Sequence, residues 1–262
     1  MYSGNNHAGY AGNNKEEQIL AGRLSDLANT CYNRNIPVFS AYLNLNDQNI
    51  LHEIHKNFPP ISIKTDGGYS LSERKIAVFL PDSEWQYELP IKLIKISPTD
   101  KRFLNALTHR DYLGALMNLG IERSLLGDIV VSDKIAYVFC LDRIASFIID
   151  NLTKVRNDFV RCEMCDALPY DFVPSFKEIT GSVASLRLDA VISLAFNESR
   201  SHSTGYIENA LVFVNGRLIT TNAYNLKDGD IVSVRGHGRF RYMYTKSETK
   251  KGRYMVVLNL YI

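Results

Sequence analysis

The first third of the chain alternates between helical and extended patterns of hydrophobic residues. From Lys15 to Asn33, apolar residues recur on one face at helical spacing, which predicts an amphipathic helix. The segments that follow are an extended piece at 37–42, a helix at 46–55, and strands at 61–65 and 75–80. Asp66-Gly67-Gly68 supplies turn residues between the two strands, and Pro81 ends the segment. Residues 15–82 are therefore predicted to form a small mixed N-terminal α/β domain.

The middle of the chain shows a strand-helix-strand-strand-helix-strand order. The expected strands cover 91–96, 128–131, 135–141 and 158–162, and the expected helices cover 103–119 and the stretch opened by Asp142 as N-cap. This order is that of the ferredoxin-like, split βαβ fold, which we predict for residues 83–167. RNA-recognition-motif domains share the layout, but their aromatic consensus is missing here. The domain therefore either contacts RNA through its sheet or acts as a spacer.

Two segments are expected to be irregular. Residues 1–14 are rich in Gly and Asn and lack the basic and apolar regions of a signal peptide, so we expect a disordered leader or an expression remnant. Residues 168–181 contain Pro169 and Pro174 and are expected to form a linker to a C-terminal domain at 182–262. Because no apolar run approaches the roughly 20 residues that span a bilayer, we expect no membrane partner and a cytoplasmic location.

Charge distinguishes the C-terminal domain from the rest of the chain. The whole chain has a formal net charge of +2. Residues 182–262 contain 11 Lys and Arg against 6 Asp and Glu, a net of +5, whereas the remaining 181 residues have a net of −3. A basic domain on a near-neutral chain indicates contact with a polyanion, although a merely basic surface patch would give the same count.

The cysteines do not indicate a disulfide framework or a metal site. The chain has four of them, and they are scattered. Cys162 and Cys165 have the spacing of half a zinc site, but structural zinc normally needs four ligands and no second pair follows. His52 and His55 lie far away in the sequence. We predict no metal and no cofactor.

The C-terminal domain begins with two helical patterns and continues as strands. A helix opens at 185–191, breaks at Asn197, and is followed by a second short helix through Tyr206 and Ile207. Strands are expected at 211–214 and 231–234. Asn215-Gly216 is a strong hairpin signal, because both positions tolerate positive φ, and Asp228-Gly229-Asp230 forms another turn.

Four landmarks in this domain match a known module. They are Arg187-Leu188-Asp189, Ser199-Arg200, Val214-Asn215-Gly216 and Gly229-Asp230-Ile231. In this order and at this spacing, over about fifty residues, they closely resemble the S4-type (alpha-L) RNA-binding domain, a helix pair packed on a small twisted sheet. The resemblance implies that the domain binds RNA.

The resemblance also implies which residues line the RNA surface. They are Arg187, Ser199, Arg200, Ser203, Asn215 and Arg217. Arginines at the starts of two helices, together with helix N-terminal amides, form a site for phosphates, and a guanidinium can also stack on exposed bases. Family members often carry a basic residue near Ser203, where this chain is polar. Asp189 is expected to have a structural role, in an ion pair or a helix-start contact, and Asn215-Gly216 also has a sufficient role as a turn.

The last hairpin alternates basic and aromatic residues. Arg239, Phe240, Arg241, Tyr242 and Tyr244 would place arginines on one face of a strand and rings on the other. The return strand is apolar at alternate positions, so the ring face is predicted to be core. The arginine face would extend an RNA surface that begins at Arg235, although a solvated basic face would show the same pattern.

The middle domain carries a second resemblance. The segments 109–115, 119–123 and 127–129 are similar to the middle domain of the YlmH family, bacterial proteins with an N-terminal domain, a ferredoxin-like domain and an S4-type domain. His109-Arg110-Asp111 is not a kinase catalytic loop, because Leu116 stands where that loop needs Asn. These polar residues are expected to cap and brace a helix.

The combined expectation is a three-domain α+β protein that binds RNA without catalysing a reaction and without a small-molecule substrate. By resemblance to S4-type proteins that act on ribosomes, the expected partners are ribosomal RNA or tRNA and the large ribosomal subunit. Two alternatives stay open: an RNA-modifying enzyme with an appended S4-type domain, and a protein-interaction adaptor linked to cell division. Against the enzyme, the sequence holds no nucleotide-binding glycine motif or class I synthetase signature, and its only Arg-Leu-Asp belongs to the binding module.

Overall fold

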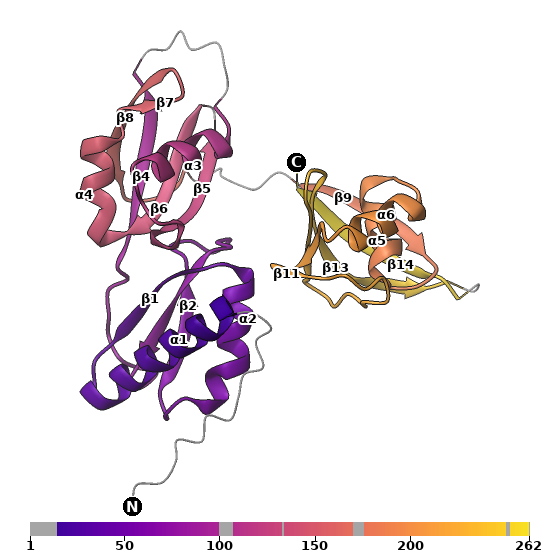
Figure 1. Ribbon diagram of the computed structural model, residues 1–262, viewed down its shortest axis with the longest axis horizontal. Coiled ribbons are helices and arrows are strands. Elements are labelled where there is room, and N and C mark those ends of the chain that lie inside the picture. Colours follow the sequence, from indigo (N-terminus) through magenta and orange to yellow (C-terminus); the bar gives the residue numbers. More distant parts are fainter. Residues whose placement is uncertain (1–14, 100–106, 133, 170–175, 250–251, 262) are drawn as a thin grey trace, which may run out of the picture. The chain divides into compact units, whose positions relative to one another are not determined.

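The computed structural model describes residues 15–99, 107–132, 134–169, 176–249 and 252–261 (Figure 1). The chain divides into two compact units, residues 1–172 and residues 173–262. The expected leader at 1–14 lies outside the described residues. No helix within the described ranges is long and apolar enough to cross a membrane.

The first unit begins with a small α/β region. Its elements are α1 (Lys15–Arg34), β1 (Val38–Leu43), α2 (Leu45–Ile54), the 3-10 helix η1 (His55–Asn57), β2 (Ser62–Asp66) and β3 (Lys75–Leu80). The strands form an antiparallel sheet in the order β1-β3-β2. One face of this sheet packs on α1 and α2 through a buried cluster that includes Leu24, Ile50 and Phe79. The region has the mixed helices and strands expected at 15–82, and it forms part of the larger unit of residues 1–172.

The second region of this unit has the predicted ferredoxin-like topology. Its elements are β4 (Ile91–Pro98), α3 (His109–Asn118), the 3-10 helix η2 (Arg123–Leu125), β5 (Leu126–Ser132), β6 (Ile135–Leu141), α4 (Asp142–Asn151), β7 (Lys154–Val155) and β8 (Asp158–Cys165). The antiparallel sheet has the order β5-β6-β4-β8-β7. Helices α3 and α4 cover one face of it (Figure 1), where Tyr112, Leu116 and Ile148 are buried in a common core.

The other face of the ferredoxin-like sheet packs against the first sheet. Tyr42, Val78 and Leu80 share a buried cluster with Leu93 and Phe139. The two regions of the first unit therefore share an apolar core and do not only lie next to each other in the sequence.

Two predicted helix starts in this unit are corrected. Among the described residues, α3 begins at His109, after the non-helical Leu107 and Thr108, because the Thr108 amide donates to Asp111 Oδ2 at 2.8 Å and closes a capping box there. Residues 103–106 lie outside the described residues. Asp142 is the first residue of α4, and the N-cap position belongs to Leu141.

The second unit is one curled sheet with two helices on a single face. Its elements are β9 (Phe176–Val183), α5 (Leu188–Phe196), α6 (Arg200–Glu208), β10 (Val212–Val214), β11 (Arg217–Leu218), β12 (Ile231–Val234), β13 (Gly238–Glu248) and β14 (Tyr254–Tyr261). The strand order is β11-β10-β12-β13-β14-β9. The core between sheet and helices contains Leu188, Ile192, Ile207, Phe240 and Leu258. The predicted S4-type fold is confirmed.

Three expectations for this unit are corrected. The expected linker includes a strand, because β9 pairs with β14 over its whole length, from Phe176–Tyr261 to Val183–Tyr254. The first helix begins at Leu188 and not at Ser185, since Arg187 occupies the N-cap position. Tyr244 is 46% exposed and does not join the core, because the register shifts between Tyr242 and Tyr244.

The Asn215-Gly216 hairpin is confirmed. The two residues have φ of 48° and 78°, and Val214 pairs with Arg217 across the turn. The Asn215 side chain donates to Asp230 Oδ1 at 2.8 Å and accepts from the Ile231 amide at 2.9 Å. This side chain therefore ties the hairpin to the start of β12.

Candidate RNA-binding surface

The starts of α5 and α6 are brought together by one buried carboxylate. Asp189 accepts from Arg187 Nε at 3.2 Å through Oδ1 and from an Arg200 Nη at 2.5 Å through Oδ2. The carboxylate side chain is 5% exposed, whereas the side chains of Arg187 and Arg200 are 45% and 53% exposed. The ion pair that the sequence suggested for Asp189 is confirmed, and we name these three residues the Asp189 clamp.

The local sequence explains why the two helix starts meet. Asn197 ends α5 in the left-handed conformation, with φ of 54°, and allows α6 to begin three residues later. Ser199 caps α6, and its hydroxyl accepts from the His202 amide at 3.3 Å. Arg200 is the first residue of α6 and Asp189 lies in the first turn of α5. The clamp therefore sits at the positive ends of both helix dipoles.

The clamp keeps a negative charge inside the fold and two positive charges at its surface. Burial acts to raise the pKa of Asp189, but hydrogen bonds from Arg200 and Arg187 outweigh it, and the pKa is lowered. A guanidinium has five N–H donors, and in the described part of the chain each arginine gives one to Asp189. The remaining donors match the forked geometry that binds phosphate oxygens.

Arg217 is exposed at the start of β11, directly after the Asn215-Gly216 turn, and the loop that follows β11 borders Arg187. A loop residue, Tyr224, accepts from the Leu188 amide at 2.9 Å, and Asn225 forms a β-bridge with Arg187. Burial and then Asp230 raise the pKa of Tyr224, and the positive charge of Arg217 opposes this rise.

Two residues of the predicted surface have their side chains occupied within the fold. Ser203 is 0% exposed, and its hydroxyl donates to the Ser199 carbonyl at 3.4 Å, so it is not open to RNA. Asn215 is held by Asp230 and Ile231 as described above. Of the polar residues, Ser199 stays exposed at the cap of α6.

The three arginines of the last hairpin and its preceding turn belong to a different face. Phe240 and Tyr242 are buried on the helix side of β13, so the alternate residues Arg239 and Arg241 point to the opposite face. The Arg235 guanidinium carbon lies 4.5 Å from the centre of the Phe213 ring, and that of Arg239 lies 4.2 Å from the Tyr261 ring. The predicted extension of one continuous surface is therefore replaced by two surfaces on opposite sides of the sheet.

Sequence reasoning missed the aromatic half of this second face. Phe213 was part of an apolar strand with no sign of which face it occupies, and Phe176 fell in the expected linker. The face of Phe213 becomes apparent only from the burial in β10, where Val212 and Val214 are buried and Phe213 is partly exposed.

In the first unit, much of the ferredoxin-like sheet is closed to RNA. Its face opposite the helices buries Leu93, Tyr137 and Phe139 against the neighbouring sheet. Further along this face, Lys95 forms an ion pair with Glu163 at 3.1 Å. Contact with RNA across the centre of that sheet, as in RNA-recognition motifs, is blocked by this packing.

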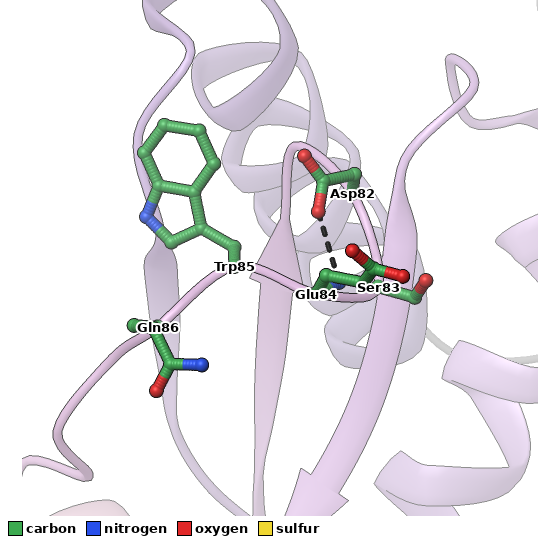
Figure 2. Close-up of a pocket in the computed structure, with 5 residues that line it drawn as sticks. All are labelled: Asp82, Ser83, Glu84, Trp85 and Gln86. Atoms are coloured by element: carbon green, nitrogen blue, oxygen red, sulfur yellow. Dashed lines mark hydrogen bonds between the residues drawn. The ribbon is translucent and has the colours of Figure 1, made fainter.

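The hollow drawn in Figure 2 does not extend the basic surface. Its lining comprises Asp82, Ser83, Glu84, Trp85 and Gln86. Asp82 Oδ1 accepts from the Glu84 amide at 2.9 Å and forms a tight turn after β3. Two carboxylates beside a hollow disfavour a polyanion.

Cys162 and Cys165 lie on opposite faces of β8. Cys162 packs with the helix-side core and Cys165 with the core between the two sheets. Among the described residues, no three His, Cys, Asp or Glu side chains are grouped as metal ligands.

Two stretches of the chain match known protein families. Residues 83–168 match the family described as a putative RNA-binding domain in YlmH, and residues 186–232 match the S4 domain. Over 199 residues the chain is 31% identical to ribosome-associated protein quality control protein P2 of Bacillus subtilis (strain 168). The matched stretch covers 75% of this chain and 77% of that protein. The structure of cell division protein ylmH from Streptococcus pneumoniae aligns with 61% of this chain and 96% of its own, at 22% identity and a TM-score of 0.48. With the S4-type unit and the ferredoxin-like region in place, the chain belongs to the YlmH family.

Proposed function

We propose that this protein binds ribosomal RNA or tRNA through the Asp189 clamp and works on ribosomal particles, in the cytoplasm, as a binding factor without catalysis. The observation that carries the proposal is the clamp itself. A buried carboxylate fixes two exposed guanidinium groups at the starts of two helices, which is an arrangement suited to backbone phosphates.

The curated relative supports the ribosomal part of the proposal. The Bacillus subtilis protein is named a ribosome-associated quality control protein. We extend this to the large subunit as the preferred particle. Phosphate contacts alone discriminate poorly between RNAs, so the first unit would add contacts and raise the overall avidity on one particle.

Gradient sedimentation of tagged full-length protein in lysate at near-physiological salt tests the proposal. We expect the protein to co-sediment with ribosomal particles, more with large than with small subunits. A matched variant, Arg187→Gln with Asp189→Asn and Arg200→Gln, removes both positive charges without leaving a buried carboxylate alone, and it should move to the top of the gradient. If the unaltered protein stays at the top, ribosomal action is wrong and a free RNA becomes the better target.

A further inference from the structure

A row of side chains crosses the face of the C-terminal sheet that points away from α5 and α6. Strand pairing joins Leu218 to Phe213, Phe213 to Ser233, and Ser233 to Arg239. The Arg239 guanidinium lies over Tyr261, which in turn pairs with Phe176. The cross-strand row thus comprises one residue from each of the six strands: Leu218, Phe213, Ser233, Arg239, Tyr261 and Phe176.

The row consists mainly of flat groups with accessible surface. Arg239 lies over Tyr261, and the Phe176 ring meets Tyr261 edge-on at 5.0 Å between centroids. Arg235, which follows β12, lies over Phe213, and we count it with the row. Phe176 and Leu218, at the two ends, are 39% and 45% exposed. With strands about 4.8 Å apart, the row extends for about 24 Å, enough for several nucleotides.

We propose that the cross-strand row is a second RNA-binding face, which takes unpaired nucleotides by stacking their bases on the arginine and aromatic planes. The proposal rests on the RNA binding proposed above and adds the kind of RNA and the surface. Bases stack on aromatic rings and on guanidinium planes with little dependence on sequence. An arginine that lies over an aromatic ring offers a planar guanidinium on which a base can stack.

Charge favours RNA over a peptide as the occupant. Arg235, Arg239 and Arg241 all belong to this face, and Arg241 pairs with Asn259, which pairs with Glu178 in the adjacent row. The face is therefore basic where the row crosses β12 and β13. The two RNA faces lie on opposite sides of one sheet, so the unit can hold backbone phosphates at the Asp189 clamp and unpaired bases at the row.

The test measures binding of the full-length protein to two RNA probes, an unstructured 12-nucleotide strand and a hairpin with a continuous duplex. The double variant Arg235→Lys with Arg239→Lys keeps both positive charges and removes both planar guanidinium groups. We expect affinity for the single strand to fall at least about fivefold, since stacking contributes about 1–3 kcal/mol per base, while affinity for the duplex changes less than about twofold. Arg253→Lys makes the same change at an exposed arginine outside the row and should alter neither affinity.

If the folded double-lysine variant keeps its affinity for the single strand, the row is overturned as an RNA face. If the Asp189-clamp variant loses affinity for the single strand in the same assay, the proposed function still stands. The double-lysine variant could instead keep its full affinity for both RNA probes and lose co-sedimentation with ribosomes. That result would assign the row to a protein partner and overturn it as an RNA face. If the unaltered protein binds neither probe, the proposed function fails first and the row with it.

Ultraviolet crosslinking of the unaltered protein to the single strand gives a readout that does not depend on variants. We expect crosslinked peptides that contain Phe213 or Tyr261. Crosslinks confined to peptides from α5 and α6 would contradict the proposal.

Discussion

Arginine has opposite roles in the two compact units. In the first unit, Arg74 Nε donates to the Leu126 carbonyl at 2.9 Å, and Arg123 donates to the same carbonyl at 2.7 Å and to that of Gly127 at 3.0 Å. Burial lowers the pKa of Arg74, and lowers that of Arg123 to about 10. In the second unit, Arg187 and Arg200 are about half exposed and are oriented by a carboxylate.

The comparison shows that the arginines differ in their acceptors: backbone carbonyls in the first unit and the Asp189 carboxylate in the second. Asp128 in the first unit accepts from the Tyr69 hydroxyl and from the amides of Glu73 and Arg74, so it joins the segment before β3 to β5. In the second unit, Asp189 accepts one hydrogen bond from Arg187 Nε and one from an Arg200 Nη, and in the described structure these are its only side-chain partners. The first arrangement stabilises a core between two sheets, and the second leaves donors for a partner.

The largest effect is expected at Asp128. Asp128→Ala removes the acceptor of three donors and should lower the free energy of unfolding of the first unit by about 3 kcal/mol. Urea unfolding followed by fluorescence of Trp85, the single tryptophan, measures this unit. Asp142→Ala is the control, because its contact with Lys92 is long, at 3.9 Å, and exposed, and it should cost less than about 0.5 kcal/mol. A similar cost for the two variants would contradict the role of Asp128.

The Asp189 clamp should separate stability from binding. Arg187→Ala with Arg200→Ala leaves a buried carboxylate unpaired and should destabilise the second unit by about 2 kcal/mol, and adding Asp189→Asn should recover about half of this. Thermal unfolding followed by near-ultraviolet circular dichroism of the tyrosines measures the change. Both variants should lose RNA affinity to the same degree. Recovery of RNA affinity by Asp189→Asn would show that the arginines act only through the fold.

The smallest effect concerns pH. The pKa of Asp189 is lowered in the folded state, so the stability it contributes is complete above its unfolded pKa of about 3.9 and is lost as the pH falls through the lower folded value. Below about pH 4, the free energy of unfolding of the second unit should therefore fall less in Asp189→Asn than in the unaltered protein, by a difference of less than about 1 kcal/mol. Asp228→Asn, at an exposed turn position, is the control. An equal pH response in the two variants would contradict the assignment.

The sequence predicted continuous apolar strands best. β3, β6 and β12 match their predicted ranges, because each is an apolar run bounded by turn residues. β9 was assigned to a linker, since its partner β14 comes from the far end of the chain and such pairing leaves no local signal.

For the candidate site, the sequence showed the residue types and the S4-type landmarks, but not which side chains are exposed or on which side of the C-terminal sheet each lies. The landmarks Arg187-Leu188-Asp189 and Ser199-Arg200 indicated the S4-type module and an ion pair or helix-start contact for Asp189, but not that both arginines contact Asp189. The burial of Ser203 depends on how α6 packs. The separation of Arg239 and Arg241 from Arg187 depends on the register of β13 against β12, which only the assembled sheet defines.

The central claim, that the exposed arginines of the Asp189 clamp contact RNA phosphates, is tested most directly by the salt dependence of RNA affinity. Each phosphate contact contributes about −0.7 to the slope of log affinity against log salt on single strands. For the folded variant Arg187→Gln with Asp189→Asn and Arg200→Gln, we predict a slope shallower than that of the unaltered protein by about 1.4, from two lost contacts. An unchanged slope in that variant would contradict the account.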